Sequence, residues 1–115
     1  VTEICDEAFM NCKKLTSVTF ADDAEVITKI GKKAFMSFQG KTLEFKNKIE
    51  VVDEYAFASE SETNVTKLET LTVTEIIKLE KFAFKDAKYL KGINGSYPSR
   101  ANNSEAFEGV PTWES

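Results

Sequence analysis

The chain has 115 residues, of which 42% are apolar and 30% charged, values usual for one soluble globular domain or for a section of a longer array. Its 15 Lys and Arg are outnumbered by 19 Asp and Glu, giving a net charge of −4. The basic residues form no stripe, so nucleic acid is not an expected partner.

Histidine is absent, which removes Ser-His-Asp and Cys-His catalytic sites and the commonest metal ligand from consideration. The two cysteines cannot form a four-cysteine zinc site. No apolar run approaches the ~18 residues of a membrane span. The chain starts on Val1 without a signal peptide, so we expect a processed or excised piece of a longer protein.

One nonapeptide recurs along the chain. It reads VTEICDEAF at 1–9, ITKIGKKAF at 27–35, IEVVDEYAF at 49–57, IIKLEKFAF at 76–84 and a degraded SRANNSEAF at 99–107. In the first four copies, the positions eight and five residues before the Phe are aliphatic. The fifth copy keeps Ala106-Phe107 but has lost both aliphatic residues.

A second motif follows each of the first four Ala-Phe pairs. It reads LTSVTF at 15–20, TLEF at 42–45, LETLTV at 68–73 and LKGING at 90–95, which approximates L-x-x-L-x-L. Its final apolar-polar-apolar alternation is the period of a half-buried strand. A small or apolar residue, Cys12, Phe38 or Ala87, stands three positions after the Phe in three copies. The third copy has the polar insert ASESETNVTK at 58–67 instead, which predicts a surface loop.

A unit of this length cannot bury its apolar face alone, but stacked copies can. The sequence therefore predicts a repeat solenoid in a single domain over 1–115. We expect repeats near 1–26, 27–48, 49–75 and 76–98, followed by a degenerate repeat or C-terminal cap at 99–115.

The pattern I-x-x-I-x-x-x-A-F-x-x-C/A-x-x-L-x-x-L-x-L resembles the BspA-like class of leucine-rich repeats. The match is closest at 1–20 and 76–93, and it extends over roughly 1–95. The resemblance implies an α/β repeat fold, a right-handed superhelical solenoid with a parallel β-sheet on its concave side and short strands and helical turns on its convex side. It also implies non-enzymatic work in a cell-surface or secreted protein, such as adhesion.

Residues between the inward aliphatic positions of the second motif should point outward, onto the concave face used by many repeat proteins. Threonine also simply suits exposed strand positions, so the same residues have a purely structural explanation. The candidate partner-binding residues are Ser17, Thr19, Thr42, Glu44, Lys46, Thr70, Thr72, Thr74 and Asn94.

Several smaller features leave alternatives open. Cys12 is expected in a buried slot and Cys5 on the surface, either as free thiols or as a disulfide. The acidic run at 21–25 lacks the glycine of a calcium loop and is interpreted as a solvated turn. Sequons begin at Asn64, Asn94 and Asn102, and Trp113 is expected to cover the last repeat.

We therefore expect a module without catalytic residues, cofactor or metal that binds a host or matrix protein, or a glycan, as a monomer at the cell surface or after secretion. The first alternative is a structural spacer with no binding of its own. A hydrolase is a remote alternative, because carboxylate pairs such as Asp53/Glu54 fall at turn positions of the repeat.

Overall fold

The computed structural model describes residues 3–10, 26–45 and 47–111, and the backbone of 19–20. Its strands are β1 (Glu3–Ile4), β2 (Thr19–Phe20), β3 (Lys29–Ile30), β4 (Thr42–Phe45), β5 (Lys48–Val52), β6 (Thr70–Leu79) and β7 (Gly92–Ser96), followed by the 3₁₀-helix η1 (Ala101–Phe107). All strand pairings in the sheet are parallel. This agrees with the parallel coils expected from the repeat.

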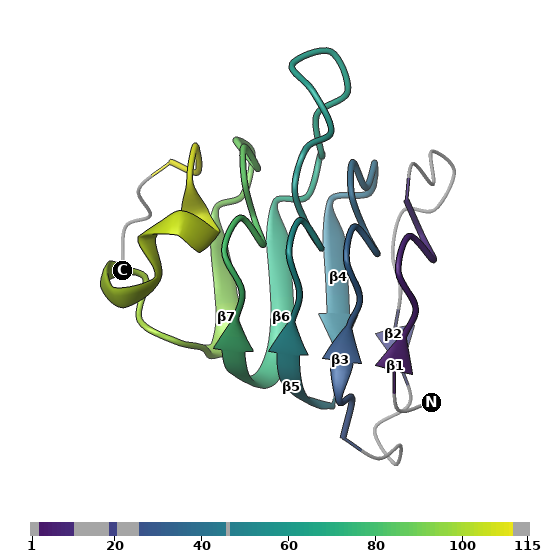
Figure 1. The fold of residues 1–115 in the computed structure, drawn as a ribbon, viewed down its shortest axis with the longest axis vertical. Helices are drawn as coiled ribbons and strands as arrows, with labels where there is room; N and C mark the ends of the chain where they lie inside the picture. Colours follow the sequence, from purple (N-terminus) through teal and green to yellow (C-terminus); the bar gives the residue numbers. More distant parts are fainter. Residues whose placement is uncertain (1–2, 11–18, 21–25, 46, 112–115) are drawn as a thin grey trace.

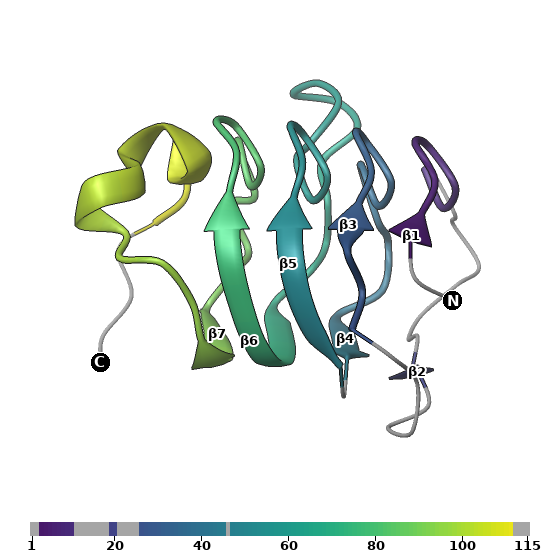
Figure 2. The ribbon, with the colours of Figure 1, turned by 60° about the horizontal axis from the view of Figure 1, so that its bottom comes forward.

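The strands make one sheet that is bent back on itself. Its order is β1-β3-β5-β6-β4-β2, with β7 also paired to β6. In Figure 1 the strands stand in two ranks that meet at the lower bend, with the turns at the top. Figure 2 shows β6 curving from one rank into the other without interruption. The two motifs of the sequence therefore form the two halves of one sheet.

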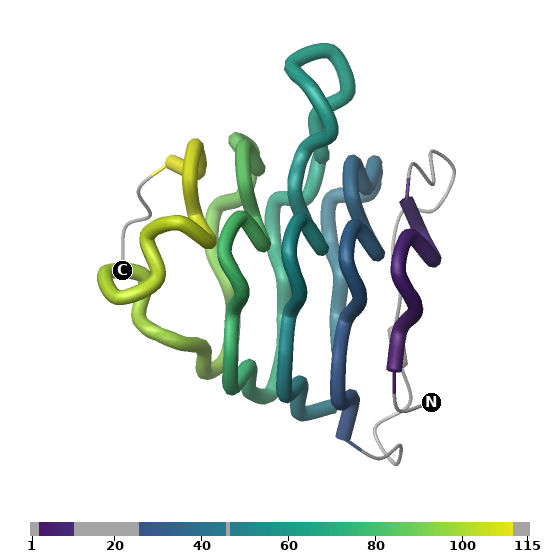
Figure 3. Tube along the Cα trace, viewed as in Figure 1, coloured from purple at the N-terminus to yellow at the C-terminus, as the bar shows by residue number. Residues whose placement is uncertain are grey.

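The core lies between the two halves. Ile27, Ile30, Leu43, Ile49 and Leu71 are each no more than 1% exposed. They come from both motifs, and the alternation of side chains along a strand places them on inward faces. Each coil contributes a thin layer that only its neighbours can cover, as the successive loops of the trace show (Figure 3).

Stacked phenylalanine rings run through the core from the first coil to the last. Ring centroids are 4.9 Å apart for Phe9–Phe35, 5.4 Å for Phe35–Phe57, 5.1 Å for Phe57–Phe84 and 5.2 Å for Phe84–Phe107. The rings are within 10° of parallel in every pair. The inward placement predicted for the Ala-Phe pairs is confirmed for the four pairs after the first. In the first pair Ala8 is exposed and Phe9 is only partly buried against the core.

The helical turns expected on the convex side are not confirmed, because η1 is the only helix in the described residues. After each I-x-x-I strand the chain makes tight turns closed by bonds such as Ala34 N–H to the Gly31 carbonyl (3.1 Å) and Met36 N–H to the Lys33 carbonyl (3.2 Å). A residue of positive φ interrupts them, Lys33 at 60° and Ser37 at 57°. A left-handed residue ends a helix, so these segments are turns. The right-handed superhelix stays a prediction.

The C-terminal copy keeps the Ala-Phe part of the repeat but not the strand that precedes it. Phe84 N–H donates to the Ala106 carbonyl (2.7 Å), the bond that each earlier Phe makes to the next copy. The segment η1 begins at the positions where the earlier copies have β1 and β3, and it continues through the turn to Phe107. The missing strand is consistent with the lost aliphatic residues. The Arg100 guanidinium closes this end by donating to the Val110 and Pro111 carbonyls and lying 5.2 Å from the Phe107 ring.

Candidate interaction surface

The outward side chains of the L-x-x-L-x-L strands fall into register across the sheet. The first row aligns Thr42, Thr70 and Gly92. The second aligns Thr19, Glu44, Thr72 and Asn94. The name threonine face is used below for the surface of Thr42, Glu44, Thr70, Thr72 and Asn94.

Burial along these strands alternates as the sequence predicts. In β4, Thr42 and Glu44 are exposed while Leu43 and Phe45 are buried. In β6, Thr70 and Thr72 are half-buried between buried Leu71 and Val73. The Asn94 amide lies 3.4 Å from the Thr72 hydroxyl, joining neighbouring strands. The structure thus gathers most of the candidate residues on one polar surface.

Four of the candidate residues are placed differently or lie outside this description. Ser17, Lys46 and the Thr19 side chain lie outside the described residues. Thr74 is exposed, but it follows a register shift between Thr72 and Glu75 and stands at the bend. Gly95, at φ +124°, lies against the Val73 carbonyl there, where any side chain would collide.

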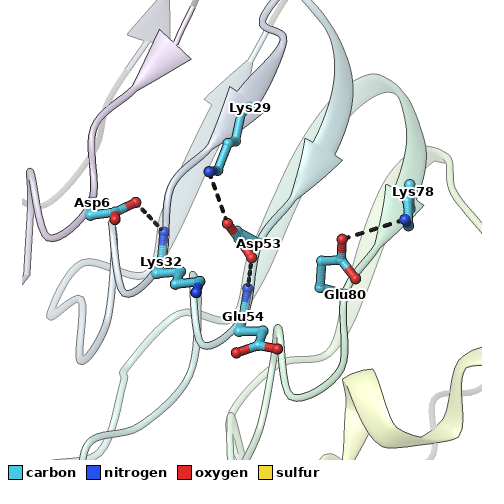
Figure 4. Close-up of polar contacts among 7 residues, drawn as sticks. All are labelled: Asp6, Lys29, Lys32, Asp53, Glu54, Lys78 and Glu80. Atoms are coloured by element: carbon cyan, nitrogen blue, oxygen red, sulfur yellow. Dashed lines mark hydrogen bonds and ion pairs between the residues drawn. The ribbon is translucent and has the colours of Figure 1, made fainter.

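The opposite half of the sheet carries ion pairs. The Nζ–carboxylate distances are 3.2 Å for Lys29–Asp53, 3.5 Å for Lys48–Glu75 and 3.5 Å for Lys78–Glu80. Two of these pairs join adjacent coils, Lys29–Asp53 and Lys48–Glu75, whereas Lys78–Glu80 lies within one coil. Figure 4 shows Lys29–Asp53 and Lys78–Glu80. Exposed ion pairs add little stability, so their clearest consequence is that these lysines already have partners.

Asp53 is the most constrained carboxylate on this side. It is only 8% exposed, and besides Lys29 it accepts the Glu54 backbone N–H at 2.7 Å. Asp6 makes a related contact one coil earlier, where it accepts the Lys32 N–H at 2.8 Å (Figure 4). The hydrogen bond from Lys29 to Asp53, with the attraction of that carboxylate, raises the pKa of Lys29. Asp53 and Glu54 are thus turn residues with structural contacts.

A feature that the sequence analysis missed lies along the turns. The residue two positions before the Phe has positive φ in four copies, namely Glu7 (61°), Lys33 (60°), Tyr55 (60°) and Phe82 (64°). The Tyr55 and Phe82 rings stack with centroids 5.5 Å apart. When the copies are aligned, Tyr55 and Phe82 fall at the position that is charged in the first two copies, Glu7 and Lys33. This contrast was visible in the sequence and could have identified the two aromatic residues.

The cysteines, the polar insert, the acidic run and Trp113 remain to be compared with the expectations from the sequence. Cys5 is exposed and is a free thiol, so the disulfide alternative is not formed. The polar insert protrudes from the turns as expected (Figure 1), although Ser59 and Thr66 within it are buried. Cys12, the acidic run at 21–25 and Trp113 lie outside the described residues.

Within the described residues, no group of three or more His, Cys, Asp or Glu is arranged to hold a metal ion. The search of that part of the chain also finds no helix with the length and apolarity to cross a membrane.

Parallel coils, a bent sheet and an aromatic ladder define a leucine-rich-repeat solenoid-like fold. The family model for the BspA type leucine rich repeat region matches residues 1–112 in six copies, and the chain belongs to this family. No curated protein and no solved structure matches the chain. Membership of this family indicates a protein-interaction module in a generally non-enzymatic class.

Proposed function

We propose that the protein is a non-catalytic interaction module that binds a protein or glycan partner through the threonine face. In this proposal the face is the concave side of a right-handed solenoid, and the module serves adhesion, or recognition of a host or matrix component, as a monomer at the cell surface or after secretion. Proteins with BspA-type repeats are often surface or secreted proteins, which supports this setting.

The observation that carries the proposal is the register of the face. Glu44, Thr72 and Asn94 stand side by side on neighbouring strands, which puts polar groups about 4.8 Å apart. Glu44 is the single charged residue among the five that make up the face. Hydroxyl and amide groups both donate and accept hydrogen bonds, so such a surface suits polar recognition without steep dependence on salt.

The spacer alternative predicts that the same face binds nothing. A hydrolase, the remote alternative, would need acid-base groups. Three of the described carboxylates on the opposite half of the sheet, Asp53, Glu75 and Glu80, are instead engaged by lysines.

The test compares two substitutions in one strand. Thr72→Arg places a long cation on the threonine face, whereas Ile77→Arg places it on the opposite half of β6, where Ile77 is 50% exposed. Both variants and the parent chain are applied to arrays of immobilised matrix proteins and glycans. We expect binding that Thr72→Arg abolishes and Ile77→Arg preserves. No binding by the parent would favour the spacer, and equal loss in both variants would place the contact elsewhere.

A further inference from the structure

Tyr89 stands just before the last strand of the threonine face and is not part of the core. It is 45% exposed, and it is the aromatic member of the three large apolar side chains that are exposed in the described part of the chain. The strand register aligns it with the polar residues Gln39 and Lys67 of the two preceding coils. Packing between coils therefore does not require an aromatic ring at this position.

The preceding coil holds the Tyr89 ring in place. The Nζ of Lys67 lies 5.0 Å from the ring centre, and a cation over an aromatic face is attracted by the ring electrons. The two coils are tied together nearby, where the Lys91 N–H donates to the Glu69 carbonyl at 2.7 Å. A ring that is already oriented costs less entropy when a ligand stacks on it.

Gly92 leaves an open place between this ring and the threonine face. It stands in the outward row of Thr42 and Thr70, and a Cβ built on it would have no atom within 4 Å. Tyr89 precedes it along the chain, and Asn94 follows it at the next outward position of β7. The name glycine notch is used below for the bare backbone at Gly92 with Tyr89 and Asn94 on its two sides.

The polar groups beside the notch suit the hydroxyls of a sugar. Asn94 shares a row with Thr72 and Glu44 on the neighbouring strands. A carboxylate accepts hydrogen bonds, whereas an amide and a hydroxyl both donate and accept. Neighbouring strands are about 4.8 Å apart, so the row presents donors and acceptors at intervals close to the width of one sugar ring.

The charges that border the notch nearly balance. Lys91 Nζ lies 3.3 Å from the Glu69 carboxylate, and Lys67 lies over the Tyr89 ring. Lys41, at the start of β4, stands on the same border as Glu69, and Glu44 lies on the face itself. Three lysines and two glutamates give no strong preference for an anionic or a cationic ligand.

We propose that the threonine face binds a neutral polysaccharide and that the glycine notch is the subsite for one of its sugar rings. The ring lies over Gly92 and stacks its C–H face on Tyr89, while its hydroxyls bond to Asn94. The next sugars bond to Thr72 and Glu44. This inference rests on the proposed function and names the class of partner for the same face.

A protein partner fits this surface less well. Stable protein interfaces bury about 800 Å² on each partner and centre on apolar and aromatic anchors. The five side chains of the threonine face are all polar, and Tyr89 stands at their border. A stacked sugar needs only one aromatic platform with polar groups beside it, which is the arrangement at the notch.

The experiment titrates the whole chain with cellohexaose, maltohexaose, N-acetylchitohexaose and a heparin hexasaccharide, followed by amide shifts in NMR spectra. We expect at least one neutral hexasaccharide to bind, with shifts at Tyr89, Gly92, Asn94 and Thr72. Its affinity should change less than about twofold between roughly 20 and 300 mM NaCl, since no ion pair is formed. The heparin hexasaccharide should bind about tenfold more weakly or not at all.

Four variants locate the sugar at the notch. Tyr89→Ala should weaken binding about tenfold, whereas Tyr89→Phe keeps the ring and should change it less than about twofold. Gly92→Thr fills the notch and should also weaken binding about tenfold. Gly92 does not have positive φ and has room for a side chain, so this variant should keep its melting temperature. Ile77→Ala, an exposed apolar position on the opposite half of β6, is the control and should bind as the parent does.

Three outcomes would overturn the inference. The first is that none of the neutral hexasaccharides binds. The second is tighter binding of the heparin hexasaccharide that salt abolishes, which would make the surface a charge-driven site. The third is undiminished binding by Gly92→Thr. A matrix protein that the parent binds and Thr72→Arg releases, with no neutral hexasaccharide bound, would refute this inference and leave the proposed function standing. Loss of the proposed function itself would show as no binding of any protein or glycan by the parent.

Discussion

Phe35 and Phe57 lie one above the other, with ring centroids 5.4 Å apart and ring planes 5° from parallel. The Phe35 N–H donates to the Ala56 carbonyl at 2.8 Å, so backbone and side chain fix the same spacing between coils. Each ring is at most 1% exposed. The stability of the array therefore depends on contacts between copies, not within them.

Truncation of an interior ring should be among the most damaging single changes. Phe57→Ala removes stacking partners on both sides, and we expect the free energy of unfolding to fall by about 3–5 kcal/mol, since neighbouring coils cannot collapse into the gap. Urea denaturation measures this. Ile77→Ala, at a half-exposed position, is the control and should change stability by no more than about 0.5 kcal/mol. A small effect at Phe57 would contradict the ladder.

The two glycines of β7 should respond oppositely to alanine. A Cβ on Gly95 would meet the Val73 carbonyl, and its φ is +124°, so Gly95→Ala should destabilise the protein by more than about 1 kcal/mol. Gly92 has nothing within 4 Å of the new atom. Gly92→Ala should therefore be neutral or stabilising by up to about 1 kcal/mol. Thermal melting of both variants gives the comparison, and equal shifts would contradict the geometry at the bend.

Lys32 and Lys33 provide a test of the left-handed turn position. Lys33 has φ +60°, so Lys33→Gly relieves a conformation that costs an L-residue about 1–2 kcal/mol, a gain offset in part by the entropy of glycine. We expect a net stabilisation of a few tenths of a kcal/mol or more. The neighbouring Lys32→Gly should destabilise by about 0.5–1 kcal/mol. Chemical denaturation of the pair distinguishes them by sign.

The Lys29–Asp53 contact predicts a change of stability at high pH. The pKa of Lys29 is raised above 10.5 in the folded protein. Its contribution is therefore complete below pH 10.5 and is lost as the pH rises through the folded value. Asp53→Asn keeps an oxygen that can accept the Glu54 N–H but removes the charge. In this variant the Lys29 pKa, followed by NMR of Nζ, should move down toward 10.5, and the part of the alkaline loss of stability due to Lys29 should shrink.

Most of the inward residues could be identified without coordinates. Ile27, Ile30 and Phe35 recur at constant spacing, and burial of recurring apolar residues follows from stacking whatever the detailed path of the chain. The outward placement of Thr42, Glu44 and Thr72 follows in the same way from the two-residue period of a strand. Both predictions depend only on local spacing, which is why they are confirmed.

The turns could not be predicted in the same way. The spacing of residues 31–38 suits one helical turn as well as a tight turn. The choice depends on backbone bonds to the next coil, such as Phe35 N–H to Ala56. The continuous path of β6 through the expected repeat boundary at 75–76 also depends on its neighbours, because β5 and β7 pair with its two halves.

The sequence by itself determined that this chain is a stack of similar coils with a phenylalanine column inside and a polar, threonine-rich strand surface outside. Its residue spacing is enough for that, because each copy can bury its apolar residues only against another copy. The tertiary structure alone decided which side chains from different coils meet. Tyr55 joins Phe82 and Lys29 joins Asp53 across a coil boundary. Such pairs depend on the exact register between coils, which arises from backbone bonds formed only when the coils are stacked.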